Sequence, residues 1–370
     1  MIKTGRSLLQ DSTAAANEIS KTISQPDVKL VNFYTSSNYD IKVVASVLKG
    51  NFPAADVIGC TTAGEISDQG FSNNSLVAMS IGNDKIARVA ASVITDLQTQ
   101  AGSSGETLKQ MSESLGLASQ NLDGTKYAGI ILIDGLSGKE EAVMNALGDA
   151  APQLLIVGAS AGDDLKFTST QVALNGEVYS DAAVLALLEM VAPFEVVKTT
   201  SYKPTDKVFE ITKADKENRI VYEFNGRNAV DVYKEAVGSA TLDASVFMSN
   251  PVGIVVEDEA FIRSPQQVLE GDKGIKFYCQ IEEGSVVNLC KATDMVKDNR
   301  EMFNMVRQSL GTVSGGIIFN CILRYLEIDA EKINQDIVDV FEGTPTVGFN
   351  TYGEELITHI NQTVTALFIK

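Results

Sequence analysis

The sequence predicts an α/β fold made of repeated strand-helix-strand units with mixed sheets, arranged as two associated domains. Three observations support this prediction. A short glycine-containing turn that ends in a carboxylate occurs three times along the chain. Each copy closes a pattern typical of a strand, a helix and a second strand. The chain has 370 residues, of which 44% are apolar, so it can bury a core large enough for two domains.

The three turns occupy residues 58–65, 157–163 and 347–354. Each ends an apolar run and contains two glycines, small hydroxyl or amide side chains, and a final carboxylate. The first and third copies have the same spacing, and the second is one residue shorter. Because glycine lets the backbone approach a neighbouring group closely, such turns can bring N–H groups up to a bound molecule. We therefore expect the turns to gather along a shared border and to line a pocket.

The first unit begins with a predicted strand at residues 30–34. Ser37 and Asp40 resemble a capping box, and apolar residues at helical spacing predict a helix over residues 41–48. The first turn follows this helix. After the turn, alternating apolar and polar residues predict two successive strands, at residues 76–81 and 86–94.

The second unit repeats this order. It has a predicted strand at residues 128–133, a helix capped by Ser137 and Glu140, and an apolar run that leads into the second turn. An Asn-Gly pair is a strong hairpin signal. Here it lies at Asn175 and Gly176 and predicts a hairpin between two alternating stretches, residues 171–174 and 183–188.

The third unit runs from a predicted strand at residues 316–319 through a helix near 330–341 to the third turn, with a last strand at 363–369. The two strands of a strand-helix-strand unit are usually parallel, so the loops after them emerge at the same edge of the sheet. Ligands of open α/β sheets bind at that edge.

A stretch with a different sequence pattern, residues 203–307, separates the second and third units. A composition shift near residues 199–205, which include Pro204, marks the expected domain boundary. The stretch predicts the following elements: a hairpin of 208–212 with 219–224, a helix at 229–237, a strand pair of 275–281 with 285–290, and a helix at 295–310.

Charge and cysteine content exclude several classes of function. Acidic residues outnumber basic residues by 48 to 30, which gives a net charge of −18 and disfavours nucleic acid and anionic membranes as partners. The four cysteines show neither metal-site spacing nor the density of a disulfide scaffold. No secretory signal and no membrane-spanning apolar stretch is apparent, so we expect a cytoplasmic protein.

These residues resemble the FIST family, whose N-terminal and C-terminal halves occur in tandem in signal-transduction proteins. The N-terminal likeness is carried by these residues: 57–65, 158–163, Asn175-Gly176 and 179–182. The C-terminal likeness is carried by these: 281–284, Phe319-Asn320-Cys321 with Arg324, 348–354 and Asn361-Gln362-Thr363. The junction, at residues 201–204, departs from the glycine-tryptophan segment associated with the family.

The resemblance implies a FIST N-terminal domain at residues 1–203 and a FIST C-terminal domain at residues 204–370. It implies a sensor that binds a small molecule, amino acids being the class usually proposed, and that acts without catalysis and without a cofactor. A separate signalling protein, such as a histidine kinase, a cyclase or a chemoreceptor, would receive the signal.

Arg324 is the first candidate for ligand recognition, because a guanidinium just past a strand end can hold a carboxylate through two parallel hydrogen bonds. Tyr352, Glu354 and Asn361 would add a hydroxyl, an acceptor and an amide on the same rim. The structural alternative is that Arg324 pairs with Glu354, and that Asn361 and Glu354 bond to turn backbone. The remaining candidates for ligand binding are Thr61, Glu65, Ser160, Asp163, Cys321 and Gly353.

Two other classes of protein are alternatives to a sensor. Residues 158–162 match the G-x-S-x-G elbow, which would make Ser160 a hydrolase nucleophile, but that motif needs a helix directly after the serine. The residues that follow predict a loop or a strand instead. Some FIST-like proteins are associated with haem and nitric-oxide sensing, and His359, the only histidine, would have to be the axial ligand.

Cys321 has two interpretations. Beside Arg324 its thiol could be activated as a redox switch or a nucleophile. At the end of a buried strand, a cysteine also serves as a small apolar side chain.

Overall fold

The structure is a computed structural model that describes residues 1–257 and 259–370, and its chain divides into two compact units. The first unit comprises residues 1–199, 299–359 and 364–370, and the second comprises residues 200–298 and 360–363. The boundaries of these units differ from those of the expected domains, 1–203 and 204–370. The reason is that most of the third strand-helix-strand repeat packs with the first two.

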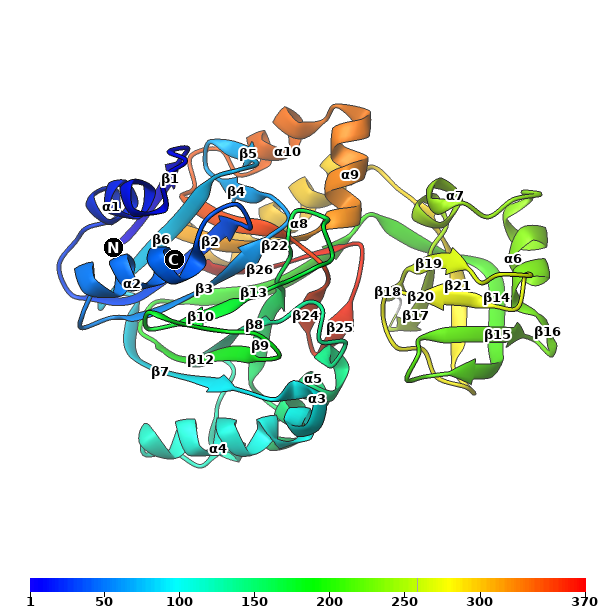
Figure 1. The fold of residues 1–370 in the computed structure, drawn as a ribbon, viewed down its shortest axis with the longest axis horizontal. Coiled ribbons are helices and arrows are strands. Elements are labelled where there is room, and N and C mark those ends of the chain that lie inside the picture. Colours follow the sequence, from blue (N-terminus) through cyan, green and yellow to red (C-terminus); the bar gives the residue numbers. More distant parts are fainter. Residues whose placement is uncertain (258) are drawn as a thin grey trace. The chain divides into compact units, whose positions relative to one another are not determined.

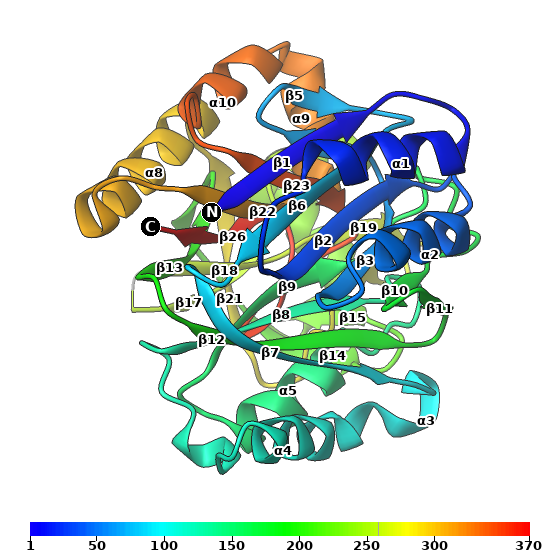
Figure 2. The same ribbon diagram turned by 90° about the vertical axis from the view of Figure 1, so that its left-hand side faces the viewer.

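The first unit contains three sheets of six strands within the described chain (Figures 1 and 2). In spatial order, sheet A consists of β1 (Ile2–Ser7), β6 (Leu76–Gly82), β2 (Val28–Ser36), β3 (Asp56–Thr62), β10 (Val172–Leu174) and β11 (Glu177–Tyr179). Sheet C consists of β7 (Ile86–Ile94), β12 (Ala183–Met190), β8 (Tyr127–Ile133), β9 (Leu155–Ser160), β24 (Glu354–Leu356) and β25 (Thr358–Ile360). Sheet B consists of β13 (Phe194–Thr200), β26 (Thr363–Ile369), β22 (Gly315–Cys321), β23 (Thr346–Thr351), β4 (Glu65–Ser67) and β5 (Gly70–Ser72).

The three sheets have the same internal order, which confirms the predicted repeat. Each has a central parallel pair, β2 with β3, β8 with β9, or β22 with β23. An antiparallel strand from the end of the same repeat lies beside the first member of each pair. The fold class is therefore α/β with mixed sheets, as the sequence predicts.

The outer hairpin of each sheet comes from a different repeat. Hairpin β4–β5 follows the first turn but pairs with β23 of sheet B. Hairpin β10–β11 follows the second turn and pairs with β3 of sheet A. Hairpin β24–β25 follows the third turn, and β24 pairs with β9 of sheet C. The three repeats thus exchange hairpins in a closed cycle, which holds them in one unit.

One sequence prediction about strand pairing is wrong. The strands predicted at 76–81 and 86–94 are present as β6 and β7, although they lie in different sheets. Asn175 and Gly176 do form a tight turn with positive φ, but their hairpin pairs β10 with β11, and β12 belongs to sheet C. Neighbours in sequence separate here because each repeat contributes to two sheets.

The helices of the first unit cover the outer faces of the sheets. Their bounds are α1 (Ser12–Thr22), α2 (Ile41–Asn51), α3 (Leu97–Gln100), α4 (Ser104–Ser114), α5 (Glu140–Ala150), α8 (Met295–Leu310), α9 (Ile322–Glu331) and α10 (Asn334–Val340), with 3₁₀ turns η1 (Ala101–Ser103) and η2 (Ser119–Asn121). Helices α1 and α2 share an apolar cluster with sheet A, and α4 and α5 share one with sheet C. Helices α8 and α10 share another with sheet B. A fourth cluster fills the space between the three sheets.

Helix starts differ from the expected caps. Asp40, and not Ser37, caps α2, because its carboxylate accepts from the N–H groups of Lys42 and Val43. Helix α5 begins at Glu140 without a side-chain cap, and the Ser137 hydroxyl accepts from the Lys139 N–H in the preceding turn. The single helix expected near 330–341 is two helices, α9 and α10, and α9 begins directly after β22.

The described residues of the second unit form one sheet of eight strands, in which the strand pairs are antiparallel. The strands are β14 (Tyr202–Asp215), β15 (Ile220–Phe224), β16 (Arg227–Asn228), β17 (Val252–Val256), β18 (Glu259–Arg263), β19 (Pro265–Val268), β20 (Ile275–Phe277) and β21 (Val286–Ala292), with helices α6 (Ala229–Val237) and α7 (Ala244–Ser249). The predicted hairpin of β14 with β15 and the helix α6 are confirmed. The expected pair of 275–281 with 285–290 is wrong, because β20 pairs with β15 and β19, whereas β21 pairs with β14 and β17.

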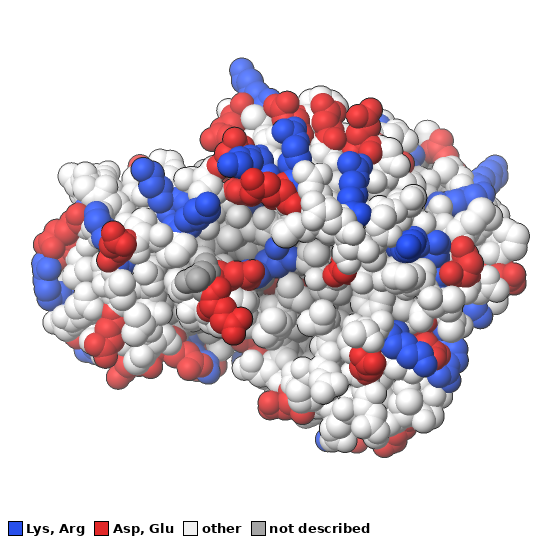
Figure 3. Space-filling model, turned by 180° about the vertical axis from the view of Figure 1, so that it is seen from behind, with Lys and Arg blue, Asp and Glu red and all other residues white. Residues whose placement is uncertain are grey.

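On the face drawn in Figure 3, acidic and basic side chains are interspersed. Among the described residues, no helix combines the length and apolarity needed to cross a membrane.

Candidate functional site

The three glycine-acid turns meet and bond to one another through their backbones. The N–H groups of Gly162 and Asp164 donate to the Thr61 and Thr62 carbonyls, both at 3.0 Å, which joins the second turn to the first. The Ser160 N–H donates to the Gly353 carbonyl at 2.9 Å, which joins the second turn to the third.

Further contacts complete the ring. The Asn350 N–H donates to the Gly64 carbonyl at 2.8 Å, and the Ala63 N–H donates to the Asn350 carbonyl at 3.1 Å. The turns therefore gather, as the sequence predicts. Their side chains are nevertheless largely buried, since Thr61, Glu65 and Ser160 are at most 3% exposed. The backbone groups that we expected to face a ligand bond to the neighbouring turns instead.

Glu65, the acid of the first turn, is fully buried and bonded within its own repeat. The Thr62 hydroxyl contacts one of its carboxyl oxygens, and the Ser75 N–H and hydroxyl donate to the other at 3.1 and 2.6 Å. Burial raises the pKa of Glu65 to about 8, although these hydrogen bonds act in the opposite direction. Glu65 is therefore held in its neutral form at pH 7.

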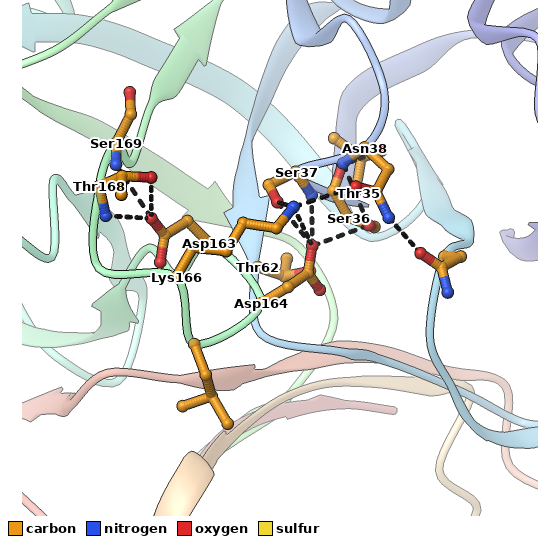
Figure 4. A network of polar contacts seen from close by, with 12 residues as sticks. Thr35, Ser36, Ser37, Asn38, Thr62, Asp163, Asp164, Lys166, Thr168 and Ser169 are labelled. Carbon is orange, nitrogen blue, oxygen red and sulfur yellow. Dashed lines mark hydrogen bonds and ion pairs between the residues drawn. The ribbon is translucent and has the colours of Figure 1, made fainter.

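Asp163, the acid of the second turn, organises the loop that follows it (Figure 4). Its carboxylate accepts from the backbone N–H groups of Phe167, Thr168 and Ser169 at 2.6 to 2.9 Å. Burial opposes its ionisation, but hydrogen bonds, led by the one from the Tyr352 hydroxyl, lower the pKa of Asp163 below its usual value. Through these bonds the charged carboxylate holds residues 163–169 in a compact loop.

Asp164 fixes the same loop to the end of β2 in sheet A. Figure 4 shows its carboxylate turned toward Ser36 and Ser37, which donate to it through their hydroxyls at 2.9 and 2.6 Å. Lys166 reaches back to the Ser37 hydroxyl at 2.8 Å. Asp164, Leu165 and Phe167 all have positive φ, a conformation that costs non-glycine residues free energy and persists only where contacts enforce it.

Tyr352, in the third turn, holds this loop from the other side. Its hydroxyl donates to the Asp163 carboxylate and accepts from the Leu165 N–H at 2.9 Å, and its ring stacks on Phe167 with centroids 4.8 Å apart. The phenol stays protonated, because burial and then the Asp163 carboxylate raise the pKa of Tyr352.

Tyr352→Phe should therefore loosen residues 163–169 without unfolding the first unit. We expect a local loss of about 1.5–3 kcal/mol, the usual range for hydrogen bonds to a charged group. Hydrogen–deuterium exchange at the amides of this loop is the measurement. Tyr325→Phe is the matched control, since the Tyr325 hydroxyl accepts a long contact of 3.4 Å from Asn73. Unchanged exchange of the loop in Tyr352→Phe would show that the hydrogen bonds of the Tyr352 hydroxyl do not hold it.

Ser160 lies in a buried cluster of titratable groups at the edge of sheet C. Its hydroxyl is 3.4 Å from carboxyl oxygens of both Glu140 and Glu355, and Glu355 bonds to Nδ1 of His359 at 2.8 Å. Burial raises the pKa of Glu355 to about 7, against the effect of His359. For His359, burial opposes protonation, but Glu355 and then Glu141 and Glu140 raise its pKa to about 9. In the described part of the chain no three His, Cys, Asp or Glu side chains are placed to hold a metal ion.

The alternative functions of Ser160 and His359 can be compared with this geometry. Ser160 ends β9, and the residues after it form a loop up to β10, so the helix that a nucleophile elbow requires does not follow it. His359 is 1% exposed, and its ring lies against Gly353 so closely that a Cβ there would be 2.8 Å from Nε2. An axial haem ligand needs space for the porphyrin at that nitrogen, so these residues do not fit a haem.

Arg324 lies in the first turn of α9 and is completely buried. Its Nε donates to Oδ1 of Asn320 at 3.2 Å, and Nδ2 of Asn320 donates to Oδ1 of Asn350 at 2.9 Å. Because the backbone of Asn350 belongs to the ring of turns, these bonds connect the guanidinium to the ring. Asn320 and Asn350 thus belong to the candidate site, although in the sequence they indicate only the family likeness.

Arg324 also lines a cavity of about 30 Å³ between sheet B and helices α8, α9 and α10. The cavity is mostly apolar, with a few polar groups. The complete lining is Ile66, Ser67, Asp68, Phe71, Asn299, Ile318, Asn320, Arg324, Ile337, Val338, Phe341, Thr346 and Val364. The charged side chains of the lining are Arg324 and Asp68. A few polar or charged groups within apolar walls are typical of sites that orient a small ligand.

The remaining candidates are distributed over both units. Cys321 precedes α9 and is buried as a reduced thiol. Glu354 is buried beneath its turn and contacts the Thr351 hydroxyl. Asn361 falls in the second unit, within the four residues 360–363, where Gln362 donates to the Tyr202 hydroxyl at 2.7 Å. The four residues of the expected rim thus lie in different local surroundings. They are Arg324, Tyr352, Glu354 and Asn361.

Comparison with known proteins agrees with these features. Two family models match in tandem, the FIST N domain over residues 29–227 and the FIST C domain over residues 229–356. An uncharacterized protein of Methanocaldococcus jannaschii is 23% identical over 320 residues, which cover 81% of this chain and 61% of that protein. This chain therefore matches less than two thirds of that relative's length.

Among solved structures, cyanuric acid hydrolase from A. caulinodans aligns over 100% of this chain and 98% of its own, with 9% identity and a TM-score of 0.32. That score is too low to support an argument about fold or function. The two tandem domain matches together cover most of the chain and agree with the turn motifs on which the structure is built. The chain belongs to the FIST family.

Proposed function

We propose that the protein is a cytoplasmic sensor that binds a small molecule carrying a carboxylate, an amino acid in the first instance, and passes the signal to a separate output protein. A histidine kinase, a cyclase or a chemoreceptor is the kind of partner we propose. FIST domains are associated with signal-transduction sensors, which supports this function at the level of the family. The observation that carries the proposal for this chain is the buried guanidinium of Arg324 in a mostly apolar cavity.

The chemistry of the cavity favours an anionic group. A guanidinium can hold a carboxylate through two parallel hydrogen bonds, and such bonds are stronger where water is excluded. The cavity, at about 30 Å³, has room for little more than water-sized groups. A ligand larger than that must displace side chains of the walls, of which Ile337 and Val338 belong to the short helix α10.

This requirement supports a route for the signal. Displacing α10 or drawing Arg324 away from Asn320 would disturb the hydrogen bonds that lead through Asn350 to the ring of turns. The ring contains Tyr352, which holds the strained loop 163–169 with its exposed Phe167. We propose this loop as the surface that responds to ligand. We propose no catalytic role for Ser160 or Cys321.

A thermal-shift screen of the twenty amino acids and of small monocarboxylates tests the proposal. A ligand that binds the folded state raises the midpoint of unfolding with its concentration. For each compound that does so, Arg324→Gln should abolish the shift or weaken the affinity at least roughly 10-fold, as expected for loss of a charge-assisted pair.

Arg300→Gln is the matched control, because Arg300 is an exposed arginine of α8 beside the cavity residue Asn299. The control should bind like the unmodified protein. A compound that shifts the midpoints of all three proteins equally would bind elsewhere and would contradict Arg324 as the recognition residue.

A further inference from the structure

A second buried polar group lies in the core between the three sheets. Asn32 belongs to β2 and has no exposed surface. Side chains alternate along a strand, and Leu30 and Tyr34 belong to the central apolar cluster, whereas Val31 and Phe33 belong to the cluster beneath α1 and α2. Asn32 therefore faces the central cluster, between Leu30 and Tyr34.

The polar atoms of this pair lack protein partners. Across residues 1–257 and 259–370, neither amide atom of Asn32 nor the hydroxyl of Tyr34 has a hydrogen bond. Both side chains are completely buried. Burying an amide or a hydroxyl without a hydrogen bond costs free energy, and nearly all such groups in folded proteins find a partner.

The repeats of the same chain show that the fold does not require these polar groups. Strand register places Phe33 opposite Gly59, Ile131 opposite Gly158, and Ile318 opposite Gly348. The residues that precede Phe33, Ile131 and Ile318 are Asn32, Ile130 and Ile317, respectively. Both isoleucines belong to the same central cluster. Likewise, Tyr34 corresponds to Leu132 and Phe319.

We propose that Asn32 and Tyr34 form an internal binding site for a small uncharged molecule that both donates and accepts hydrogen bonds. The amide of Asn32 offers two donors and an acceptor, and the Tyr34 hydroxyl offers one donor and an acceptor. A charged guest is excluded by the apolar surroundings, which include the rings of Phe319 and Phe349 at 6.2 and 4.8 Å from the Tyr34 ring. The guest is an ordered water or a small organic molecule of the same hydrogen-bonding chemistry. This site is independent of Arg324.

Asn32→Ile is the direct test, because it installs the residue found at the equivalent position of the other repeats. If a guest bonds to Asn32, the variant should lose it and unfold at a temperature at least roughly 3 °C lower than the unmodified full chain. Tyr34→Phe removes only the hydroxyl and should lower the midpoint by a smaller amount. If the amide were simply unsatisfied, Asn32→Ile would replace it with apolar surface and raise the midpoint, which would overturn the proposal.

Two further measurements identify the guest. Mass spectrometry of the small molecules released on acid denaturation should find an organic guest in the unmodified protein and not in Asn32→Ile. If nothing is released, a high-resolution crystal structure should show a water within hydrogen-bond distance of both Asn32 and the Tyr34 hydroxyl. Density in which both side chains bond only to protein atoms would refute the site.

Discussion

Replacing Gly158 with alanine is expected to destabilise the first unit by at least about 3 kcal/mol or to prevent folding, since overpacking of a rigid backbone lies at the upper end of small-to-large costs. A Cβ on Gly158 would lie 1.8 Å from the Ile131 carbonyl oxygen of the neighbouring strand. That oxygen is backbone within a parallel pair, so it cannot move without separating β8 from β9. Gly348 meets the Ile318 carbonyl at the same distance, and Gly348→Ala should have the same effect.

Gly148→Ala is the matched control. Gly148 lies inside α5, is exposed, and has no atom within 4 Å of the position its Cβ would take. Alanine favours a helix over glycine, so this variant should gain up to about 1 kcal/mol. Urea denaturation of the three variants supplies the measurement. Equal effects of Gly158→Ala and Gly148→Ala would contradict the close strand approach that the structure shows.

The free energy of unfolding should fall as the pH rises from about 5 to 9. Burial raises the pKa of Glu65 to about 8, whereas an unfolded chain has it near 4.5, so the folded state holds a proton that the unfolded state releases. This contribution is fully present below the unfolded pKa and is lost as the pH rises through 8. Glu355 and His359 act in the same direction, with pKa values raised to about 7 and about 9. Each such proton contributes about 1.4 kcal/mol for each pH unit.

Glu65→Gln isolates the first of these groups. Glutamine imitates the neutral carboxyl and cannot ionise, so the variant should lose less stability than the unmodified protein between pH 6 and 8. Chemical denaturation at several pH values measures both curves. Parallel curves for the two proteins would show that Glu65 is not protonated in the folded state.

The architecture of single repeats was accessible from sequence because its signals are local. The apolar runs before Gly59, Gly158 and Gly348 predict the parallel pairs, and the spacing over residues 229–237 and 295–310 predicts helices α6 and α8. These features depend on neighbouring residues and on periodicity alone. The gathering of the three turns followed from the rule that loops after parallel strands share one edge.

The exchange of hairpins was not accessible, because strand pairing is decided by contacts between distant repeats. Asn175 and Gly176 define a tight turn, but nothing local specifies that β10 pairs with β3 rather than β12. The burial of the turns also arises from contacts between distant repeats. Their backbone groups are occupied by the other turns, and a single motif gives no sign of this.

The sequence indicated Arg324 as a candidate but not its surroundings. In the sequence, Arg324 is a candidate because it follows a predicted strand. In the structure it lies on α9 and is completely buried. Its link to the turns through Asn320 and Asn350 crosses thirty residues of sequence. The walls of its cavity come from four elements or more, among them β4 of the first repeat, so no local pattern could indicate them.

A crystal structure of the full chain with the carboxylate found by the thermal-shift screen would show whether Arg324 recognises the ligand. We expect the ligand's carboxylate within hydrogen-bond distance of the Arg324 guanidinium, with side chains of α10 displaced from the cavity. Ligand density at any other place, with Arg324 still bonded to Asn320 and α10 unmoved, would contradict this expectation.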